Sequence, residues 1–345
     1  MGIKIIQCMF GKSQGGLEQV SIDHTLTLAS SNIETHFFCH SKSPYANIIK
    51  NKVNVSTFSC TNRFNLLLKF QLVKKIKTIC PDIIFLHGNR AVELITPVRK
   101  YIPKDIKLCA TTHNYRNKRF TKLDATLAIS HSLIQDLIQR GISEEKIFYC
   151  PNATKLLPYQ QISIKDPPAL GALGRLHYVK GYDILLKACK LLNDKKVCFK
   201  LFIAGDGEEK ENLQSLCSNL GISKKVKFLG WITDYSAFFD KIDIFCLPSR
   251  SEGMPVSLLQ ALSHSKPSII SDIPGPREII TKKNCGFVMN KFTPQSLADC
   301  IEKMLNDHEL IQNFAKLSWE TIEQEYSSQR QKQRLLEITN KILSQ

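Results

Sequence analysis

Glu252 and Gln260 are the two polar residues whose types and spacing point most directly to chemistry. They lie eight positions apart, a little over two turns of an α-helix, so both side chains can line the same side of a bound ligand. Pro255, between them, suits the first position of a helix, where its missing N–H has no intrahelical partner. The other N–H groups at that helix start favour a phosphate, and a carboxylate beside it can accept hydrogen bonds from sugar hydroxyls. Alternatively, Glu252 only caps the helix and Gln260 is a solvated surface residue.

Two cations and two histidines are further candidates. Arg175 and Lys180 follow an apolar run, and at this spacing they can meet both phosphates of a nucleotide diphosphate and stabilise the charge that develops as a sugar–phosphate bond breaks. His113 lies in a polar cluster at the end of another apolar run, and His87 ends a third. The alternatives are solvated surface charges for the cations and hydrogen-bonded strand-end positions for the histidines.

Two pairs of glycines follow apolar runs. Gly15 and Gly16 come after the first run, where a missing Cβ lets the backbone approach a ligand closely. Gly205 and Gly207 form a Gly-x-Gly turn in the second half. A tight turn between a strand and a helix explains either pair equally well.

The elements that must position these residues alternate along the chain. Short apolar runs, which we predict to be strands, are separated for the most part by amphipathic segments, such as 65–78 and 182–192. This alternation predicts α/β domains with doubly wound parallel sheets that bind ligands at the carboxyl ends of their strands. The predicted strands are 3–9, 33–39, 53–58, 83–87, 106–112, 125–129, 170–175, 199–204, 226–229, 242–247 and 286–289.

The length of the chain favours two domains. Its 345 residues are many for one domain and enough for two, each with its own core. A polar linker rich in Pro and Gln at 154–168 marks the boundary. We therefore predict domains at 1–153 and 167–318, followed by an amphipathic C-terminal segment at 319–345.

Composition excludes several classes of protein. The 12 cysteines are scattered without a C-x-x-C motif or a paired Cys/His spacing, and no acidic D-x-D pair occurs, so we predict no metal site and no disulfide framework. No apolar run approaches the ~20 residues that cross a bilayer, and the first apolar segment is too short for a signal peptide. We expect a cytoplasmic protein.

The formal net charge of +16 is concentrated in the first half of the chain. Between Lys42 and Lys122 there are 17 Lys and Arg residues against three acids, a difference of +14. Such a surface attracts a polyanion, for example an anionic lipid or a phosphorylated glycan, unless it only reflects a Lys-rich genomic composition. The interleaved aromatic residues of nucleic-acid-binding proteins are missing, so we predict no nucleic-acid partner.

The segment Ser-Glu-Gly-Met-Pro at 251–255, with Gln260 behind it, resembles the E-x7-E signature of retaining glycosyltransferases of the GT-B fold, in particular family 4. Further motifs occur in the same order as in that family: Gly-Gly-x-Glu at 15–18, G-R-x4-K-G at 174–181 and G-x-G at 205–207. The likeness spans nearly the whole chain and is most specific between 171 and 279. It implies two Rossmann-like domains facing across a cleft, the first for the acceptor and the second for the donor, with the C-terminal segment returning to the first.

The resemblance also implies roles for individual residues. Glu252 would contact the transferred sugar, Arg175 and Lys180 the diphosphate, and His113 the reacting side of the sugar; these four are the predicted catalytic residues. Gln260 stands where the family usually has a Glu that holds the ribose, and losing the charge would weaken donor binding by about 1 kcal/mol. The full set implied to bind the donor is Gly16, Arg175, Lys180, Gly205, Ile232, Glu252, Gly253, Met254, Pro255, Val256 and Gln260.

The predicted function is a hexosyltransferase-type enzyme of the cell envelope. By the resemblance, it moves a sugar from a UDP- or GDP-sugar, with retention and without a cofactor or metal, to a hydroxyl of a glycan or glycolipid such as a lipopolysaccharide core. The charge places it as a peripheral protein at the inner face of a bacterial cytoplasmic membrane. The alternative is a nucleotide-binding module of little activity that works as an interaction protein, a hypothesis prompted by Gln260.

Overall fold

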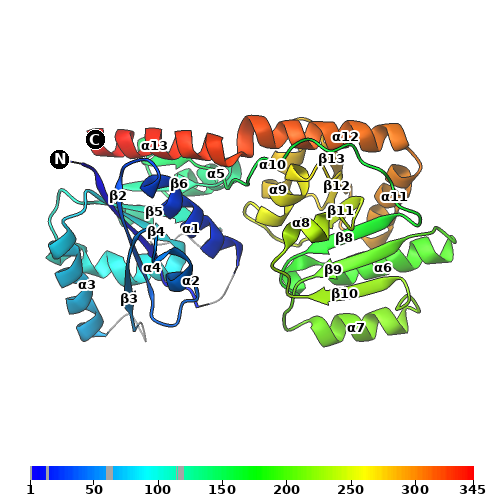
Figure 1. Ribbon diagram of the computed structural model, residues 1–345, viewed down its shortest axis with the longest axis horizontal. Coiled ribbons are helices and arrows are strands. Elements are labelled where there is room, and N and C mark those ends of the chain that lie inside the picture. Colours follow the sequence, from blue (N-terminus) through cyan, green and yellow to red (C-terminus); the bar gives the residue numbers. More distant parts are fainter. Residues whose placement is uncertain (1, 13–14, 60–64, 114, 116–119) are drawn as a thin grey trace. The chain divides into compact units, whose positions relative to one another are not determined.

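The computed structural model describes residues 2–12, 15–59, 65–113, 115 and 120–345, which divide into two compact units. The first unit comprises Met1–Asn152 and Gln329–Gln345, and the second comprises Ala153–Ser328. Residues 319–328, which the sequence analysis grouped with the C-terminal segment, therefore pack with the second unit. Figure 1 shows the two units and the labels of their elements.

The first unit is built on a seven-stranded parallel sheet in the order β3-β2-β1-β4-β5-β6-β7. Its central strands are mainly buried, because helices cover both faces of a parallel sheet. All five residues of β4, for example, are buried. The strands are β1 (Lys4–Met9), β2 (Glu34–His40), β3 (Asn54–Phe58), β4 (Ile83–His87), β5 (Lys107–Thr112), β6 (Ala125–Ala128) and β7 (Ile147–Tyr149).

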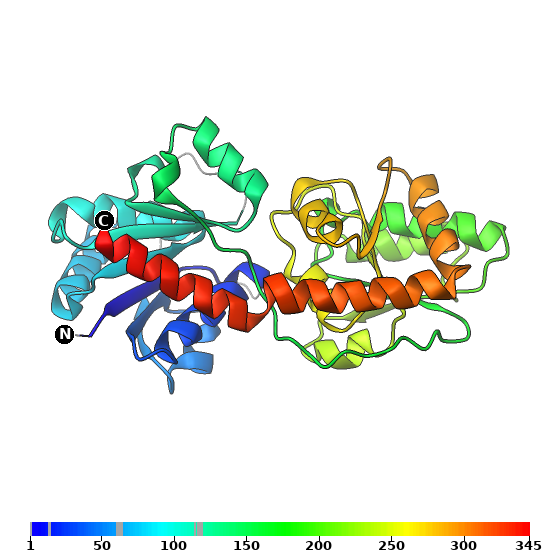
Figure 2. The ribbon, with the colours of Figure 1, turned by 90° about the horizontal axis from the view of Figure 1, so that it is seen from above.

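The helices of the first unit include one from the far end of the sequence. In α13 (Ser328–Ser344), Leu335, Ile338 and Ile342 are buried in one core cluster with Ile5 of β1 and Phe85 of β4. Figures 1 and 2 both show this helix, in red, lying along the sheet. The others are α1 (Gly16–Ala29), α2 (Tyr45–Ile49), α3 (Leu66–Ile79), α4 (Gly88–Ile95), η1 (Thr96–Tyr101), η2 (Phe120–Lys122), α5 (His131–Gln139) and η3 (Glu144–Lys146).

The second unit contains a six-stranded parallel sheet in the order β10-β9-β8-β11-β12-β13. Its strands are β8 (Ala169–Leu173), β9 (Lys200–Ala204), β10 (Val226–Gly230), β11 (Ile244–Leu247), β12 (Ser268–Ile270) and β13 (Gly286–Val288). Its helical elements are η4 (Tyr178–Lys180), α6 (Tyr182–Asp194), α7 (Lys210–Asn219), α8 (Tyr235–Phe239), α9 (Val256–Ser263), α10 (Pro274–Thr281), α11 (Pro294–Leu305), α12 (His308–Thr321) and the π-helical turn η5 (Ile322–Tyr326).

The prediction of doubly wound parallel sheets is confirmed in both units. Every run predicted as a strand forms one, with bounds that differ by at most two residues. The two strands that were not predicted, β7 and β12, are only three residues long.

Each sheet has one point where the strand order reverses. In the first unit the chain runs outward from β1 through β2 to β3 and then returns to place β4 on the other side of β1. In the second unit β8 and β11 are the corresponding neighbours. The loops that leave two such strands diverge and open a crevice, which is where ligands bind in open α/β sheets.

Candidate functional site

The reversal point of the second unit brings together two predicted motifs. The loop after β8 carries Arg175 and Lys180, and the loop after β11 carries Glu252. Lys180 Nζ lies 2.6 Å from Glu252 Oε1, although the two residues are 72 positions apart in the sequence. Arg175 is exposed at the carboxyl end of β8. The structure therefore places the predicted cations and the predicted carboxylate in adjacent loops.

Glu252 is held from two sides. Besides the ion pair with Lys180, its Oε1 accepts a 2.8 Å hydrogen bond from Ser249 Oγ. The side chains of Lys180 and Glu252 are only 22% and 12% exposed, so the pair is largely shielded from water. The alternative in which Glu252 caps the following helix is wrong, because α9 has no side-chain cap.

The start of α9 differs by one residue from the prediction. Pro255 has an extended backbone (φ −73°, ψ 118°) and is the N-cap, while the helix begins at Val256. Met254 and Pro255 are buried, whereas Gly253, Val256 and Gln260 are half-buried. A helix start without a side-chain cap leaves its first N–H groups to a solvent molecule or an anion.

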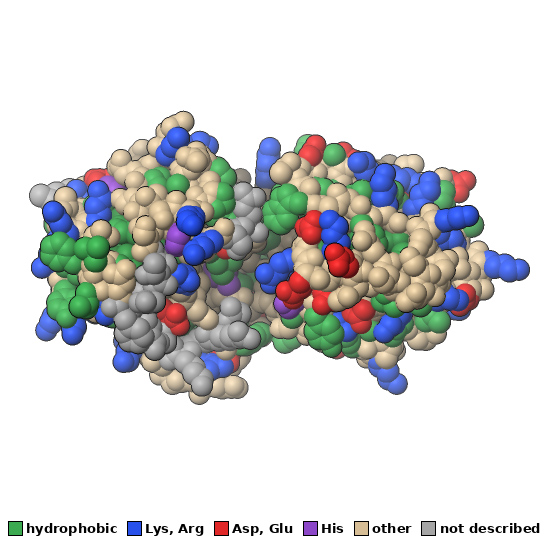
Figure 3. Space-filling view, turned by 90° about the horizontal axis from the view of Figure 1, so that it is seen from below, with side chains coloured by type: hydrophobic (Ala, Val, Ile, Leu, Met, Phe, Trp, Pro, Cys, Tyr) green, Lys and Arg blue, Asp and Glu red, His purple; other side chains and the backbone are tan. Residues whose placement is uncertain are grey.

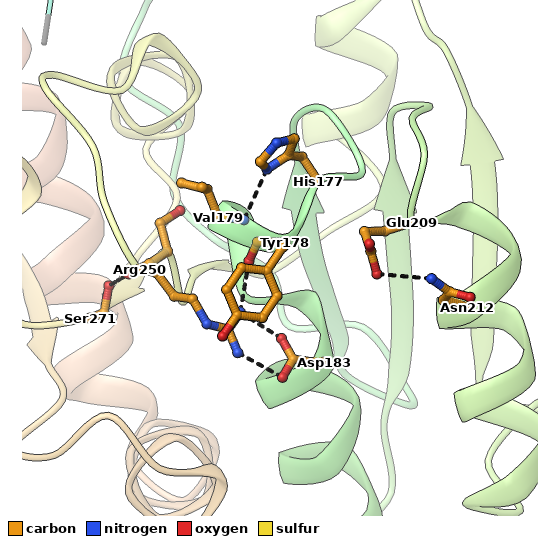
Figure 4. A network of polar contacts seen from close by, with 9 residues as sticks. His177, Tyr178, Val179, Asp183, Glu209, Asn212, Arg250 and Ser271 are labelled. Atoms are coloured by element: carbon orange, nitrogen blue, oxygen red, sulfur yellow. Dashed lines mark hydrogen bonds and ion pairs between the residues drawn. The ribbon is translucent and has the colours of Figure 1, made fainter. Parts of the chain in front are cut away.

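Arg250 braces the two loops against each other. Its guanidinium donates to both carboxylate oxygens of Asp183 on α6, each at 2.8 Å, and to the carbonyl oxygen of Tyr178 at 2.7 Å. The Tyr178 ring lies 3.8 Å from the guanidinium carbon, and the Arg250 N–H donates to the Val179 carbonyl. Figure 4 shows the side chain reaching from the β11 loop to the turn after β8. This brace ties the loop that carries Lys180 to the loop that carries Glu252.

The pKa of Asp183 reflects this brace. Burial alone would raise the pKa of the carboxyl, but the hydrogen bonds and charge of Arg250 outweigh it, so the pKa lies below its ordinary value of 3.8. Hydrogen bonding to Asp183 likewise raises the pKa of Arg250. Both groups are therefore charged throughout the physiological pH range. The sequence analysis missed Arg250, Asp183 and Ser249, because charged and hydroxyl residues in a loop are common and nothing local distinguishes these.

Two glycines allow the loops to pack this closely. Gly181 has φ +67°, and a Cβ there would lie 1.9 Å from the carbonyl oxygen of Pro248. Gly205 has φ +135°, and a Cβ there would lie 1.9 Å from the carbonyl oxygen of Gly174. Gly205, a predicted donor contact, thus has a structural reason to be glycine. Ile232, another predicted donor contact, is half-buried just beyond β10.

A cluster of polar side chains, of which Gln7, His24 and His87 are buried and His113 is half-buried, lies at the reversal point of the first unit. His87, at the end of β4, forms a 2.5 Å hydrogen bond between its Nε2 and Gln7 Oε1 on the neighbouring strand β1. Its ring centroid lies 5.4 Å from that of His24 on α1 and 6.2 Å from that of His113, which follows β5. We call Gln7, His24, His87 and His113 the histidine cluster.

The histidine cluster is uncharged at neutral pH. Burial lowers the pKa of His24 to about 4 and that of His113 to about 3, and burial together with the neighbouring histidines lowers the pKa of His87. A neutral imidazole has one donor and one acceptor nitrogen, so the cluster can exchange hydrogen bonds with hydroxyl groups.

The cluster also contains unused hydrogen-bonding capacity. Among the described residues, Gln7 Nε2, His24 Nε2, His87 Nδ1 and His113 Nε2 have no hydrogen-bond partner. Buried polar atoms normally have a protein or solvent partner, so these four atoms can bond solvent or a bound molecule. Of the cluster, the sequence analysis named only His113 and His87. A glutamine within an apolar strand was the signal that could have indicated Gln7, whereas His24 lies in a helix with many polar residues and nothing local distinguishes it.

Gly16, the remaining predicted site residue, is the first residue of α1, with Gly15 as an extended N-cap. The neighbouring residues 13–14 lie outside the described part of the chain. The described residues include no group of three or more His, Cys, Asp or Glu side chains able to hold a metal ion. Within the same part of the chain, every helix is too short or too polar to span a bilayer.

Comparison with known proteins decides the family. The model of the glycosyl transferases group 1 matches residues 158–318, and that of glycosyltransferase family 4 matches residues 14–156. The chain belongs to the group 1 glycosyltransferases. A lipopolysaccharide core biosynthesis glycosyltransferase of Rhizobium meliloti, LpsE, is 24% identical over 94% of this glycosyltransferase and 95% of its own chain. An uncharacterised glycosyltransferase of Haemophilus influenzae is 25% identical over 86% of this chain and 89% of its own.

Solved structures show the same fold. The glycosyltransferase resembles HepE of Anabaena, solved in complex with UDP-glucose, with a TM-score of 0.85 and 19% identity over 98% of this chain and 99% of the other. It also resembles the lipopolysaccharide outer core galactosyltransferase WaaB, with a TM-score of 0.77 and 22% identity over 99% of both chains. The predicted GT-B fold and family membership are thereby confirmed.

Proposed function

We propose that this glycosyltransferase moves a sugar from a UDP- or GDP-sugar to a hydroxyl group of a cell-envelope glycan or glycolipid, with retention at the anomeric carbon. The observation that carries the proposal is the shielded pair of Lys180 and Glu252 at the reversal point of the second unit, next to the uncapped start of α9. The relatives support the donor class, because HepE was solved with UDP-glucose. They also support the acceptor class, because LpsE is named as a glycosyltransferase of lipopolysaccharide core biosynthesis.

In this proposal the donor lies along the β8 and β11 loops. Arg175, Lys180 and the α9 start take the diphosphate, with the backbone of Gly253, Met254 and Val256 beside it. The carboxylate of Glu252 accepts hydrogen bonds from the sugar hydroxyls once the diphosphate draws Lys180 toward it. Farther along, Gln260 bonds the ribose and the backbone near Ile232 meets the base.

The reaction breaks the bond between the anomeric carbon and the diphosphate oxygen. The electron pair leaves with the diphosphate, where Arg175, Lys180 and the helix start stabilise it without a metal ion. The acceptor oxygen forms the new bond on the same face, and its proton passes to the leaving phosphate oxygen. His113, which is neutral and carries an unpartnered Nε2 among the described residues, would bond the reacting sugar.

A panel of nucleotide sugars tests this function. UDP-, GDP- and ADP-sugars are incubated with the enzyme and a lipopolysaccharide core acceptor, with and without a chelator, and released nucleoside diphosphate is measured. We expect release from one UDP- or GDP-sugar, insensitivity to the chelator, and a product whose anomeric proton coupling matches that of the donor. An inverted product would overturn retention, and loss of activity with the chelator would overturn metal independence. Diphosphate binding without turnover would instead favour the interaction-module hypothesis.

A further inference from the structure

Helix α3 exposes large apolar side chains at the edge of the first unit. Leu66 is 77% exposed, Leu67 65% and Phe70 66%. The neighbouring element η1, which packs against α3, ends in Tyr101 with 50% exposure. We call this region the α3–η1 surface; it comprises Leu66, Leu67, Phe70, Tyr101, Lys69, Lys74, Lys75, Lys77 and Lys100.

The fold does not need these exposed side chains. The inward face of α3 is already formed by four buried residues, Leu68, Leu72, Ile76 and Ile79, at helical spacing. The helix start is capped by Asn65, whose side chain accepts the N–H of Leu68 at 3.0 Å. Leaving three large apolar side chains in water lowers solubility without improving the packing, which indicates a contact outside this unit.

The same surface is strongly basic. α3 contains four lysines and no acidic residue. Lys74, Lys75 and Lys77 are exposed, and the ammonium group of Lys100 lies 4.8 Å from the centroid of the Tyr101 ring. Figure 3 shows hydrophobic side chains between Lys and Arg side chains at the end of the first unit where Figure 1 places α3. Apolar tips surrounded by cations are complementary to a lipid bilayer with anionic headgroups.

We propose that the α3–η1 surface docks the glycosyltransferase on an anionic lipid bilayer. Leu66, Leu67 and Phe70 enter the boundary between headgroups and acyl chains, and the lysines stay among the phosphates. A second copy of the chain fits less well, because two such surfaces would repel each other. A nucleic acid would leave Leu66 and Leu67 unused, since aliphatic side chains offer no ring for base stacking. The proposal stands on this surface alone and does not depend on the donor or the acceptor.

Vesicle binding of the full chain tests the proposal. Wild-type protein is sedimented with vesicles of phosphatidylcholine alone and with 30% phosphatidylglycerol, as a series of ~10 lipid concentrations. Two triple variants separate the apolar from the electrostatic contribution to vesicle binding. The first removes the apolar tips and is Leu66→Ser, Leu67→Ser, Phe70→Ser. The second removes three charges and is Lys74→Gln, Lys75→Gln, Lys77→Gln. The charge control is Lys200→Gln, Lys224→Gln, Lys227→Gln, which removes three exposed lysines from the second unit. Ile48→Ser, at a side chain that is 58% exposed on α2, is the apolar control.

We expect binding to the anionic vesicles only, weakened about 100-fold by the α3 lysine variant, because each Lys near an anionic surface contributes about a factor of five. The apolar variant should weaken binding at least about 10-fold, and both controls should bind like the wild type. In Phe70→Trp, emission should shift to the blue and be quenched by brominated acyl chains.

Three results would overturn the proposal. The first is equal binding of the wild type to neutral and anionic vesicles. The second is an equal loss of vesicle affinity in the α3 lysine variant and in the control lysine variant. The third is a wild-type dimer that the apolar substitutions dissociate, which would assign the surface to a second copy of the chain. Thermal melting of every variant shows that it is folded, and release of nucleoside diphosphate from a soluble donor should be unchanged. A failure of docking is thereby distinguishable from a failure of the proposed chemistry.

Discussion

Replacing Arg250 should separate positioning from binding in the donor-site loops. Arg250 holds the turn after β8 to the loop after β11 through three hydrogen bonds of 2.7–2.8 Å, two of them to the carboxylate of Asp183. In Arg250→Ala all three are lost, and Asp183 keeps its charge without its partner. In Arg250→Lys the charge remains, but an ammonium group cannot reproduce the planar two-pronged geometry.

The size of the effect follows from the number of bonds and their exposure. Hydrogen bonds to charged groups contribute about 1.5–3 kcal/mol each when shielded from water. The side chains of Arg250 and Asp183 are 20% and 29% exposed, so solvent screening reduces each bond to about 1 kcal/mol. We expect Arg250→Ala to lower the free energy of unfolding of the second unit by about 3 kcal/mol, which corresponds to a fall in Tm of about 6–12 °C. Arg250→Lys should lose about half as much.

Activity should fall further than stability alone explains. A displacement of 1 Å between Lys180 and Glu252 would cost about 100-fold in rate. We therefore expect kcat/KM for the nucleotide sugar to fall about 10–100-fold in Arg250→Ala at a temperature where the variant is folded, with an intermediate loss in Arg250→Lys.

Calorimetry and steady-state kinetics measure the two effects. The matched control is Arg277→Ala, which removes an exposed arginine paired with Asp272 and should cost at most about 1 kcal/mol with no loss of activity. Because Arg250 holds the pKa of Asp183 below 3.8, the difference in stability between wild type and variant should persist down to pH 5 and vanish only as Asp183 is protonated, below about pH 4. Wild-type activity in Arg250→Ala would refute the positioning role.

Two further predictions concern backbone packing and buried charge. Gly181→Ala should abolish activity and destabilise the second unit by more than Gly221→Ala does. Both glycines have a φ near +67°, but only at Gly181 would a Cβ meet a carbonyl oxygen. Melting curves of the two variants therefore measure the effect of the clash at equal backbone strain. The histidine cluster should make stability fall with acid, because its folded pKa values lie below the unfolded value of 6.5. Between pH 7 and pH 5.5 each histidine lowers the free energy of unfolding by about 1 kcal/mol. Urea unfolding at the two pH values measures the slope, and a slope unchanged in His24→Asn would contradict the assignment for that residue.

The fold was predictable because a buried parallel strand can be recognised from its own residues and from the turn that follows it. In the run 83–87 every residue except the last is apolar, and the turns that follow such runs carry Gly, Pro or polar residues. β7 and β12 are only three residues long, a length at which a strand is easily missed, although β13 of the same length was predicted. The sequence pattern did not locate the division at residue 328, because both α12 and α13 are amphipathic and a pattern does not say which core a helix joins.

The candidate site was predictable only in its motif residues. Glu252 and Lys180 were found because each belongs to a turn with a recognisable pattern, although nothing local says that they touch. The Arg250 and Asp183 pair joins residues 67 positions apart, and the bond from His87 to Gln7 spans 80. Contacts of this kind depend on the order of the strands, which a single sequence does not determine.

The central claim is tested most directly by two variants, Lys180→Met and Glu252→Gln. For each we would measure the affinity for the nucleoside diphosphate and for the nucleotide sugar. Each substitution keeps the size of the side chain and removes its charge. We predict that Lys180→Met weakens the binding of UDP or GDP, whichever the wild type prefers, by about 10–100-fold, in line with the loss of one charge-assisted contact. Glu252→Gln should keep diphosphate affinity but lose the additional affinity for the nucleotide sugar and at least about 100-fold in turnover. Wild-type binding and turnover in both variants would contradict the account.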